Sequence, residues 1–183
     1  MKKSALSLPL SALSLLLASC NLPLPQADTT RHFTLSAPAA TAPVAQATQV
    51  RPVQLAGHLH GRSMAVRVSE HEVIYLDDIR WAESLDEAIT QQLRARLGAV
   101  AGGGTVSVEI LRCELDRSAG NTVQLAASYT IVPADGLKSS AYRGNFAATP
   151  RAWDGRDYNV LVGLLSQAVG DLGDALAAVV EKK

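Results

Sequence analysis

The sequence predicts a single α/β or α+β domain in which a mixed sheet is covered by helices. Several short stretches alternate between apolar and polar residues, as strands with one buried face do. Two longer stretches, residues 84–100 and 157–180, instead carry apolar residues at helical spacing. The chain has 183 residues, which suits one domain after removal of an N-terminal leader.

The first half of the domain is predicted to be mostly strand. Residues 31–35 form a short first strand, and the Pro/Ala/Thr-rich residues 36–48 form a loop. Residues 49–55 resume a strand pattern, in which Pro52 indicates a sheet edge or a strand start. After a turn at residues 57–63, the apolar runs at 64–68 and 72–76 are expected to pair as a hairpin.

A helix is expected to begin at Ser84, which forms a capping box with Glu87 three residues later. Its apolar residues fall on one stripe, so the helix should be amphipathic and lie on the sheet. The glycines at residues 102–104 are expected to end the helix and turn the chain. They do not indicate a phosphate-binding loop, because no Lys-Ser/Thr pair follows them.

The second half is predicted to be a three-strand meander followed by a long helix. Residues 105–116 alternate well but slip by one register after Ile110, which indicates a bulge. A turn leads to a strand at residues 122–132, and the Asp135-Gly136 hairpin signal leads to a third strand within residues 137–148. Asp157 is expected to cap a helix that reaches Val180. Its glycines at 163, 170 and 173 predict close approach by a neighbouring element.

The first twenty residues have the layout of a bacterial lipoprotein leader. Two lysines precede an apolar run at residues 5–17, and Leu17-Ala18-Ser19-Cys20 completes a lipobox. The run is shorter than the roughly 20 residues that a membrane span needs. We therefore expect residues 1–19 to be cleaved, Cys20 to carry lipid, residues 20–30 to form a flexible tether and residues 31–183 to fold. Asn21, rather than an aspartate, follows the cysteine and favours the outer membrane, with the domain facing the periplasm.

Composition argues against a nucleic-acid-binding protein. Cleavage removes two of the 17 basic residues and none of the 17 acidic ones, so the mature chain carries a net charge of about −2. Aromatic residues make up only 4% of the sequence, too few for a platform that stacks bases. The sequence has no Walker motif, nucleophile elbow or catalytic triad order, so we expect no enzyme and no cofactor besides the lipid on Cys20.

Four further features each allow two interpretations. Cys113 is expected to be a buried core residue rather than a reactive thiol. Trp81 either packs in the core or docks a partner, with core packing favoured. The adjacent carboxylates Asp77 and Asp78 fit a solvated turn better than a cation site. His58 and His60 have a spacing that could chelate zinc, but they lack further ligands and fit a surface loop.

The lipobox, the strand at residues 31–35, Tyr75 and the stretch from Arg80-Trp81 to Leu85 resemble the auxiliary lipoproteins of ABC-type transport systems. The nearest members are the Pqi-type lipoproteins that accompany MCE-domain proteins. The first strand reads His32-Phe33 where that family more often has two tyrosines. The resemblance implies a mixed, roughly five-stranded sheet with flanking helices, similar to the anticodon-binding-like fold of the TolB N-terminal domain.

The resemblance also implies a role. It suggests a homo-oligomer that acts as the outer-membrane partner of an MCE protein in moving lipid between the membranes. Tyr75, Arg80 and Trp81 are then candidates for docking that partner or for packing in the core. The alternative is a structural lipoprotein that maintains the envelope, or assists outer-membrane assembly, without a direct part in transport.

Overall fold

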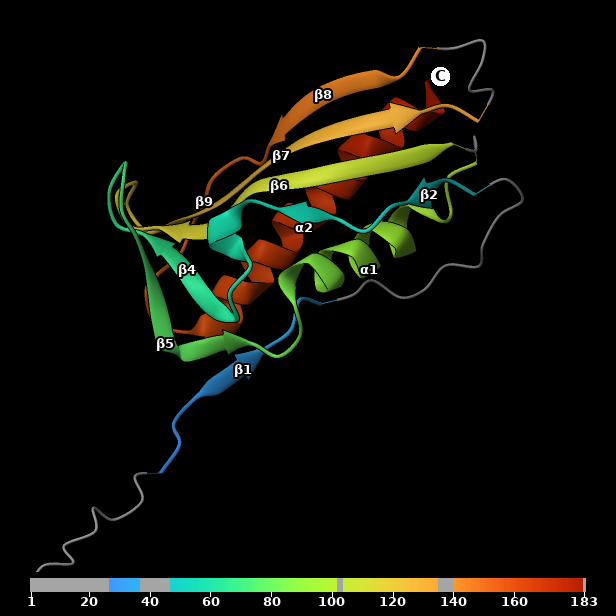
Figure 1. Ribbon diagram of the computed structural model, residues 1–183. Coiled ribbons are helices and arrows are strands. Elements are labelled where there is room, and N and C mark those ends of the chain that lie inside the picture. Colours follow the sequence, from blue (N-terminus) through green and yellow to red (C-terminus); the bar gives the residue numbers. More distant parts are fainter. Residues whose placement is uncertain (1–26, 37–46, 102–103, 135–139, 183) are drawn as a thin grey trace, which may run out of the picture.

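A computed structural model describes residues 27–36, 47–101, 104–134 and 140–182, and these form one mixed sheet with two helices (Figure 1). In chain order the elements are β1 (Arg31–Phe33), β2 (Gln49–Val50), β3 (Gln54–Leu55), the 3-10 helix η2 (Gly57–Leu59), β4 (Ser63–Arg67), β5 (Val73–Trp81), α1 (Leu85–Leu97), β6 (Thr105–Asp116), β7 (Thr122–Val132), β8 (Tyr142–Ala147), β9 (Arg151–Ala152) and α2 (Tyr158–Glu181). The expected fold class is confirmed.

Within the described residues the sheet has nine strands, more than the roughly five that the family resemblance implies and the seven that the residue patterns predict. Six of them follow one path, in the order β1-β5-β4-β6-β7-β8. One edge of β6 pairs antiparallel with β7 along its length. The other edge pairs in parallel with β2, β3 and β4 in succession. The central strand β6 therefore connects the two halves of the chain.

The predicted strand over residues 49–55 is split into β2 and β3, with Pro52 between them. Proline has no backbone N–H and interrupts the ladder. Polar side chains of α1 bind the backbone on either side of the proline. The Val53 N–H donates to Thr90 Oγ1 at 2.9 Å, and Arg94 Nε donates to the Val50 carbonyl at 3.2 Å. These two hydrogen bonds hold α1 against the segment that contains β2 and β3.

Helix α1 begins where the sequence predicts, with Ser84 at the N-cap, but the reciprocal capping box does not form. The Ser84 hydroxyl lies 3.5 Å from the Glu87 carboxylate and makes no bond to a backbone N–H. The helix ends at Leu97 with Gly98 as C-cap, ahead of the glycine run. Residues 102 and 103 of that run, like the Asp135-Gly136 turn, lie outside the described residues.

The bulge expected in β6 and the N-cap expected at the start of the C-terminal helix α2 are both confirmed. The β6–β7 register shifts between Ile110 and Arg112, so Leu111 is the extra residue and is 40% exposed. After the bulge Cys113 and Leu115 are buried, as Ile110 is before it. At the start of α2, Asp157 Oδ1 accepts the Asn159 N–H at 2.8 Å.

The hairpin of β4 and β5 is also confirmed, but β5 is longer than expected. It continues to Trp81 because its last three residues pair in parallel with β1. Asp77 and Asp78 are exposed residues within this strand, so their expected place in a turn was wrong.

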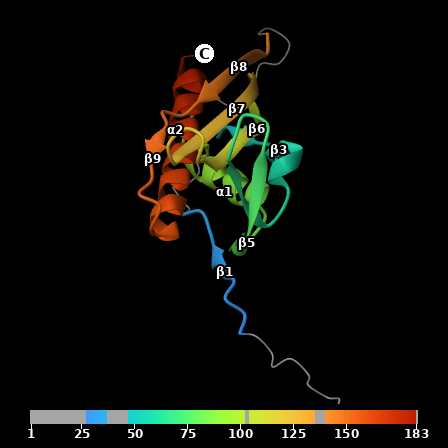
Figure 2. The same cartoon turned by 90° about the vertical axis from the view of Figure 1, so that its left-hand side faces the viewer.

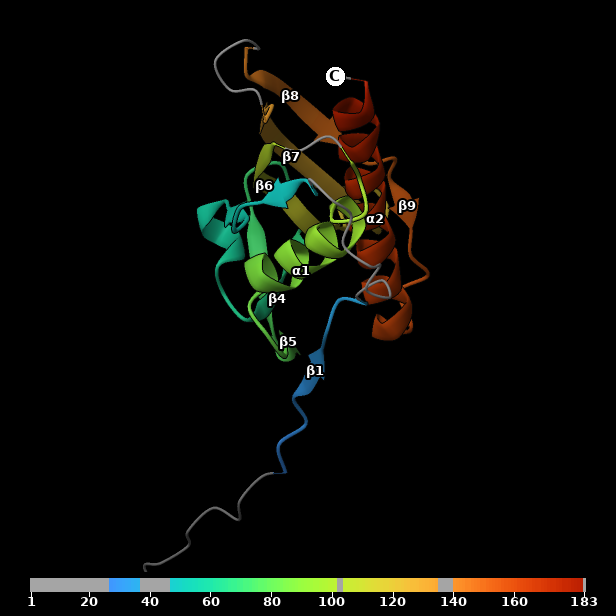
Figure 3. The ribbon, with the colours of Figure 1, turned by 90° about the vertical axis from the view of Figure 1, so that its right-hand side faces the viewer.

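Both helices lie on the same face of the sheet, as the two side views show (Figures 2 and 3). Helix α2 packs on β6, β7 and β8 and also contacts α1. The largest fully buried side chains come from both layers: Met64, Ile79, Ile89, Leu93, Leu97, Ile110, Leu115, Leu125, Leu161, Leu165, Leu172 and Leu176. Length and composition alone would allow α2 to cross a membrane, but its apolar stripe is buried in this core.

Candidate functional site

The folded domain begins at the β1–β5 edge of the sheet. Phe33 pairs with Trp81 there, and the Ala82 N–H donates to the Phe33 carbonyl at 2.9 Å. Phe33 is buried and its ring lies 6.3 Å from that of Tyr158 in α2. The N-terminal segment is therefore anchored to both layers. The lipobox and Cys20 lie outside the described residues. Ten residues lie between Cys20 and Arg31, and the eleven Cα–Cα steps that join the two can span at most about 40 Å.

Tyr75, Arg80 and Trp81 all lie on β5, but the structure separates them into core and surface. Trp81 is 4% exposed, so the favoured core interpretation is confirmed, and its backbone N–H donates to the Arg62 carbonyl at 2.7 Å. Tyr75 is 46% exposed and donates its hydroxyl to the His58 carbonyl at 3.1 Å. Arg80 is exposed and its Nε donates to the Asp77 carbonyl at 3.0 Å. Only Tyr75 and Arg80 are placed to meet a partner.

A charged cluster centred on Glu114 lies on the sheet face opposite the helices. Glu114 is fully buried, and its Oε1 accepts from Arg67 Nε at 2.7 Å and from Arg112 Nε at 2.8 Å. Arg112 also donates to Asp116 Oδ2 at 2.7 Å. Residues 112, 114 and 116 alternate with the core residues Cys113 and Leu115, so strand geometry puts all three on one face.

His58 covers this cluster from η2. Its Nε2 lies 3.4 Å from Glu114 Oε2, and neither atom has a hydrogen-bond partner in the described part of the chain. His58 is therefore only partly a surface residue, and it faces a buried carboxylate. His60 is exposed. No group of three potential metal ligands occurs among the described residues.

Hydrogen bonds to charged partners shift two pKa values within the cluster. Burial alone would lower the pKa of Arg112, but its bonds to Asp116 and Glu114 outweigh burial and raise it. Burial alone would raise the pKa of Asp116, whereas hydrogen bonds from Ser118, Arg112 and the Ala119 N–H lower it overall. Both groups are therefore held in their charged forms.

Cys113 is buried on the core side of β6, as expected. Burial, with a smaller effect of the Glu114 charge, raises the pKa of its thiol to about 12. The thiol is thus protonated at neutral pH, which fits a core residue. The sequence pattern predicts the burial of this residue, but the Glu114 cluster was not predicted. The available signal was the run of charged residues at every second position of β6, together with Arg67 on the neighbouring strand.

The architecture defines a class of protein: a two-layer domain of a mixed sheet and two helices, with the first strand, β1, at one sheet edge. More specifically, the family described as "ABC-type transport auxiliary lipoprotein component" matches residues 33–177, and the chain belongs to that family. The expected family is confirmed. Membership supports an accessory role in transport and a membrane-associated location in the cell envelope.

Two solved structures have a similar fold. One, described as an uncharacterized protein, is 15% identical with a TM-score of 0.69, and the similarity covers 82% of this chain and 98% of the other. The second is protein XCC0632 from Xanthomonas campestris, of family DUF330. It is 16% identical with a TM-score of 0.62, and the similarity covers 80% of this chain and 91% of that one. No curated protein sequence matches the chain.

Proposed function

We propose that this protein is a non-catalytic accessory subunit of an ABC-type system that moves lipid between the two bacterial membranes, in which it docks an MCE-domain protein. The family match over residues 33–177 carries the proposal. The lipobox supports it, because lipid on Cys20 would hold the domain at a membrane while the tether lets it reach a partner in the periplasm.

Outer-membrane attachment is the second part of the proposal and rests on Asn21. The tether would join the domain at β1, so the β1–β5 edge would lie nearest the membrane, together with Arg80. The open sheet face and the outer side of α2 would remain accessible to a partner or to another copy in a homo-oligomer.

Co-purification tests the role. The tagged full-length protein would be extracted from its own cells in mild detergent, and the expected result is co-purification of an MCE protein encoded beside it. A variant with Cys20→Ala serves as control, since it should be made but absent from the membrane fraction. If no MCE protein co-purifies, while an established lipoprotein–MCE pair does under the same conditions, the transport role is wrong and the structural alternative is favoured.

Membrane fractionation on a sucrose gradient tests the location separately. The wild-type protein should sediment with the outer membrane, and Asn21→Asp should move it to the inner-membrane fraction. Wild-type protein in the inner-membrane fraction would contradict the proposed location and leave the docking role untouched.

A further inference from the structure

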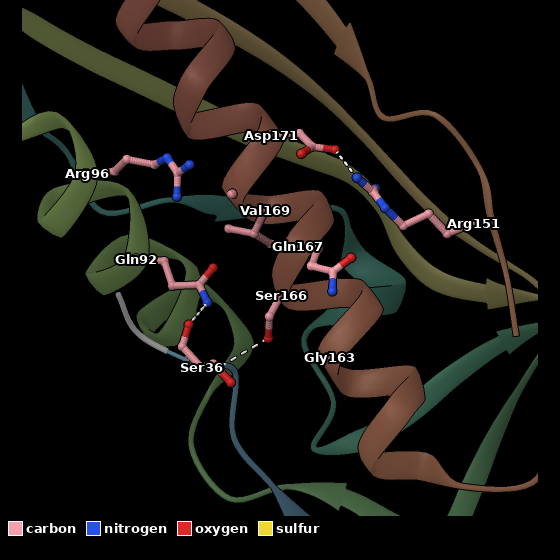
Figure 4. Close-up of a pocket in the computed structure, with 10 residues that line it drawn as sticks. Ser36, Gln92, Arg96, Arg151, Gly163, Ser166, Gln167, Val169 and Asp171 are labelled. Carbon is pink, nitrogen blue, oxygen red and sulfur yellow. Dashed lines mark hydrogen bonds and ion pairs between the residues drawn. The ribbon is translucent and has the colours of Figure 1, made fainter. Parts of the chain in front are cut away.

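A cavity of about 540 Å³ lies along the outer side of α2, away from the sheet. Its floor includes Gly163, Ser166 and Gly170 of α2. Figure 4 shows Gln92 on the α1 side of this helix and Arg151 on the opposite side. We call this cavity the α2 groove. It lies apart from the Glu114 cluster, which is on the sheet face opposite the helices.

The α2 groove already holds one stretch of backbone. The Ser36 N–H donates to Ser166 Oγ at 3.1 Å, and the Ser36 carbonyl accepts from Gln92 Nε2 (Figure 4). Side chains from both helices thus bind the N–H and the C=O of a single residue. This is the pattern of contacts by which a groove recognises polypeptide independently of its side chains.

Two further polar atoms of the α2 groove have no partner in the described residues. One is Oε1 of Gln92, a residue that is only 5% exposed, and the other is Nη1 of Arg151. Both atoms are buried, and an unpaired buried polar atom costs free energy until a ligand pairs with it. The carbonyl oxygen needs a donor and the guanidinium needs an acceptor. A peptide group supplies one of each.

The charges around the α2 groove favour a neutral ligand over an anion. Arg151 forms an ion pair with Asp171, and Arg96 forms one with Asp174. The two positive charges are therefore balanced. A phosphate group would pair with a guanidinium, but it would face the aspartates and leave the Gln92 carbonyl without a donor.

The floor of the α2 groove also suits close approach by backbone. A Cβ atom added at Gly163 would meet no atom of the described residues within 4 Å, so these residues leave the space above Gly163 open. At Gly170 the nearest atom to an added Cβ would be Arg96 Nη1, at 3.5 Å. Glycine at these two positions leaves room that larger side chains would fill.

We propose that the α2 groove binds an extended peptide segment of a partner protein, with the peptide backbone passing over Gly163 and Gly170. Gln92 Oε1 accepts a backbone N–H of that segment, and Arg151 Nη1 donates to one of its carbonyls. The inference goes beyond the proposed function, because it requires only the groove and holds whether or not the partner is an MCE protein.

The test uses the full-length protein in detergent and a phage-displayed library of random 12-residue peptides. Peptides selected on the wild type would be synthesised, and their affinities measured by fluorescence anisotropy. Gly163→Leu fills the groove, and we expect it to weaken binding at least tenfold. Gln92→Met removes the buried amide and should also weaken binding. Ala178→Leu, at an exposed position of the same helix outside the groove, should bind as the wild type does.

Circular dichroism would first establish that the variants are folded. Gly163→Leu replaces glycine within a helix, so its melting temperature should not fall. The proposal is overturned if no peptide is selected, or if all variants bind the selected peptides equally. It is also overturned if glycerophosphoethanolamine binds in a Gly163-dependent manner in place of peptide. A change of oligomeric state in Gly163→Leu, measured by light scattering, would assign the groove to a second copy instead.

Discussion

Replacing Glu114 with glutamine removes the charge at the centre of the buried cluster and nearly preserves its shape. The wild-type carboxylate accepts two charge-assisted hydrogen bonds, from Arg67 and Arg112. Each such bond contributes about 1.5–3 kcal/mol. Breaking a fully buried ion pair costs about 3–5 kcal/mol, because the remaining charge is left unpaired.

The loss of stability expected for Glu114→Gln is smaller than the cost of breaking a fully buried ion pair. The side chain of Arg67 is 18% exposed and that of Arg112 is 32% exposed, so water partly compensates both cations. Arg112 also keeps its bond to Asp116. We therefore expect the free energy of unfolding to fall by about 2–3 kcal/mol. At about 2–4 °C per kcal/mol this lowers the melting temperature by roughly 4–12 °C.

Urea unfolding at pH 7 measures this loss. The two tryptophans of the chain, Trp81 and Trp153, are both buried, so their fluorescence reports loss of the core. Glu70→Gln is the matched control, because its carboxylate is 88% exposed and its removal should change stability by less than about 0.5 kcal/mol. A loss below about 1 kcal/mol for Glu114→Gln would refute the assignment of a stabilising role to the cluster.

Three further predictions follow from single residues. Cys113 should not react with a thiol reagent at pH 8 until urea is added, because the pKa of its thiol is about 12, and rapid reaction of the native protein would contradict its burial. Asp116 has a lowered folded-state pKa, so it stabilises the fold above its ordinary pKa of 3.8 and loses this contribution as the pH falls below that value. As the pH is lowered, the free energy of unfolding should therefore fall less steeply in Asp116→Asn than in the wild type. Identical pH dependence of the two proteins would count against the prediction. Gly104 has a φ of +114° and an added Cβ would lie 2.6 Å from the Val132 carbonyl oxygen. Gly104→Ala should therefore lower the free energy of unfolding by at least about 1–2 kcal/mol. Gly163→Ala should instead raise it by about 0.5–1 kcal/mol, because alanine restricts the unfolded chain more than glycine does. Urea unfolding of the two variants checks that their effects on stability have opposite signs.

Much of the secondary structure could be predicted because its signals are local. Strands β6 and β7 have the predicted bounds, since apolar residues at every second position mark a strand with one buried face. The slip in that alternation located the bulge at Leu111. Asp157 caps α2 as expected, because a cap involves only the first turn of a helix.

Other local signals did not decide the structure. The capping box of Ser84 and Glu87 is present in the sequence, yet its hydrogen bonds to the backbone do not form. Asp77 and Asp78 have turn-like composition, but pairing with β1 extends β5 beyond them. Local preferences are worth about 1 kcal/mol or less per residue, so strand pairing can outweigh them.

The sequence by itself contained the lipobox and determined the family, the class of fold and the burial of Cys113, and it favoured the burial of Trp81 without deciding it. Only the tertiary structure decided how distant polar residues meet. Glu114 lies 47 residues from Arg67 and 56 from His58, and Gln92 lies 56 from Ser36. Periodicity reports which face of an element is buried and carries no information about which elements are neighbours. The parallel pairing of β6 with β2, β3 and β4 and the packing of α1 against α2 supply that information.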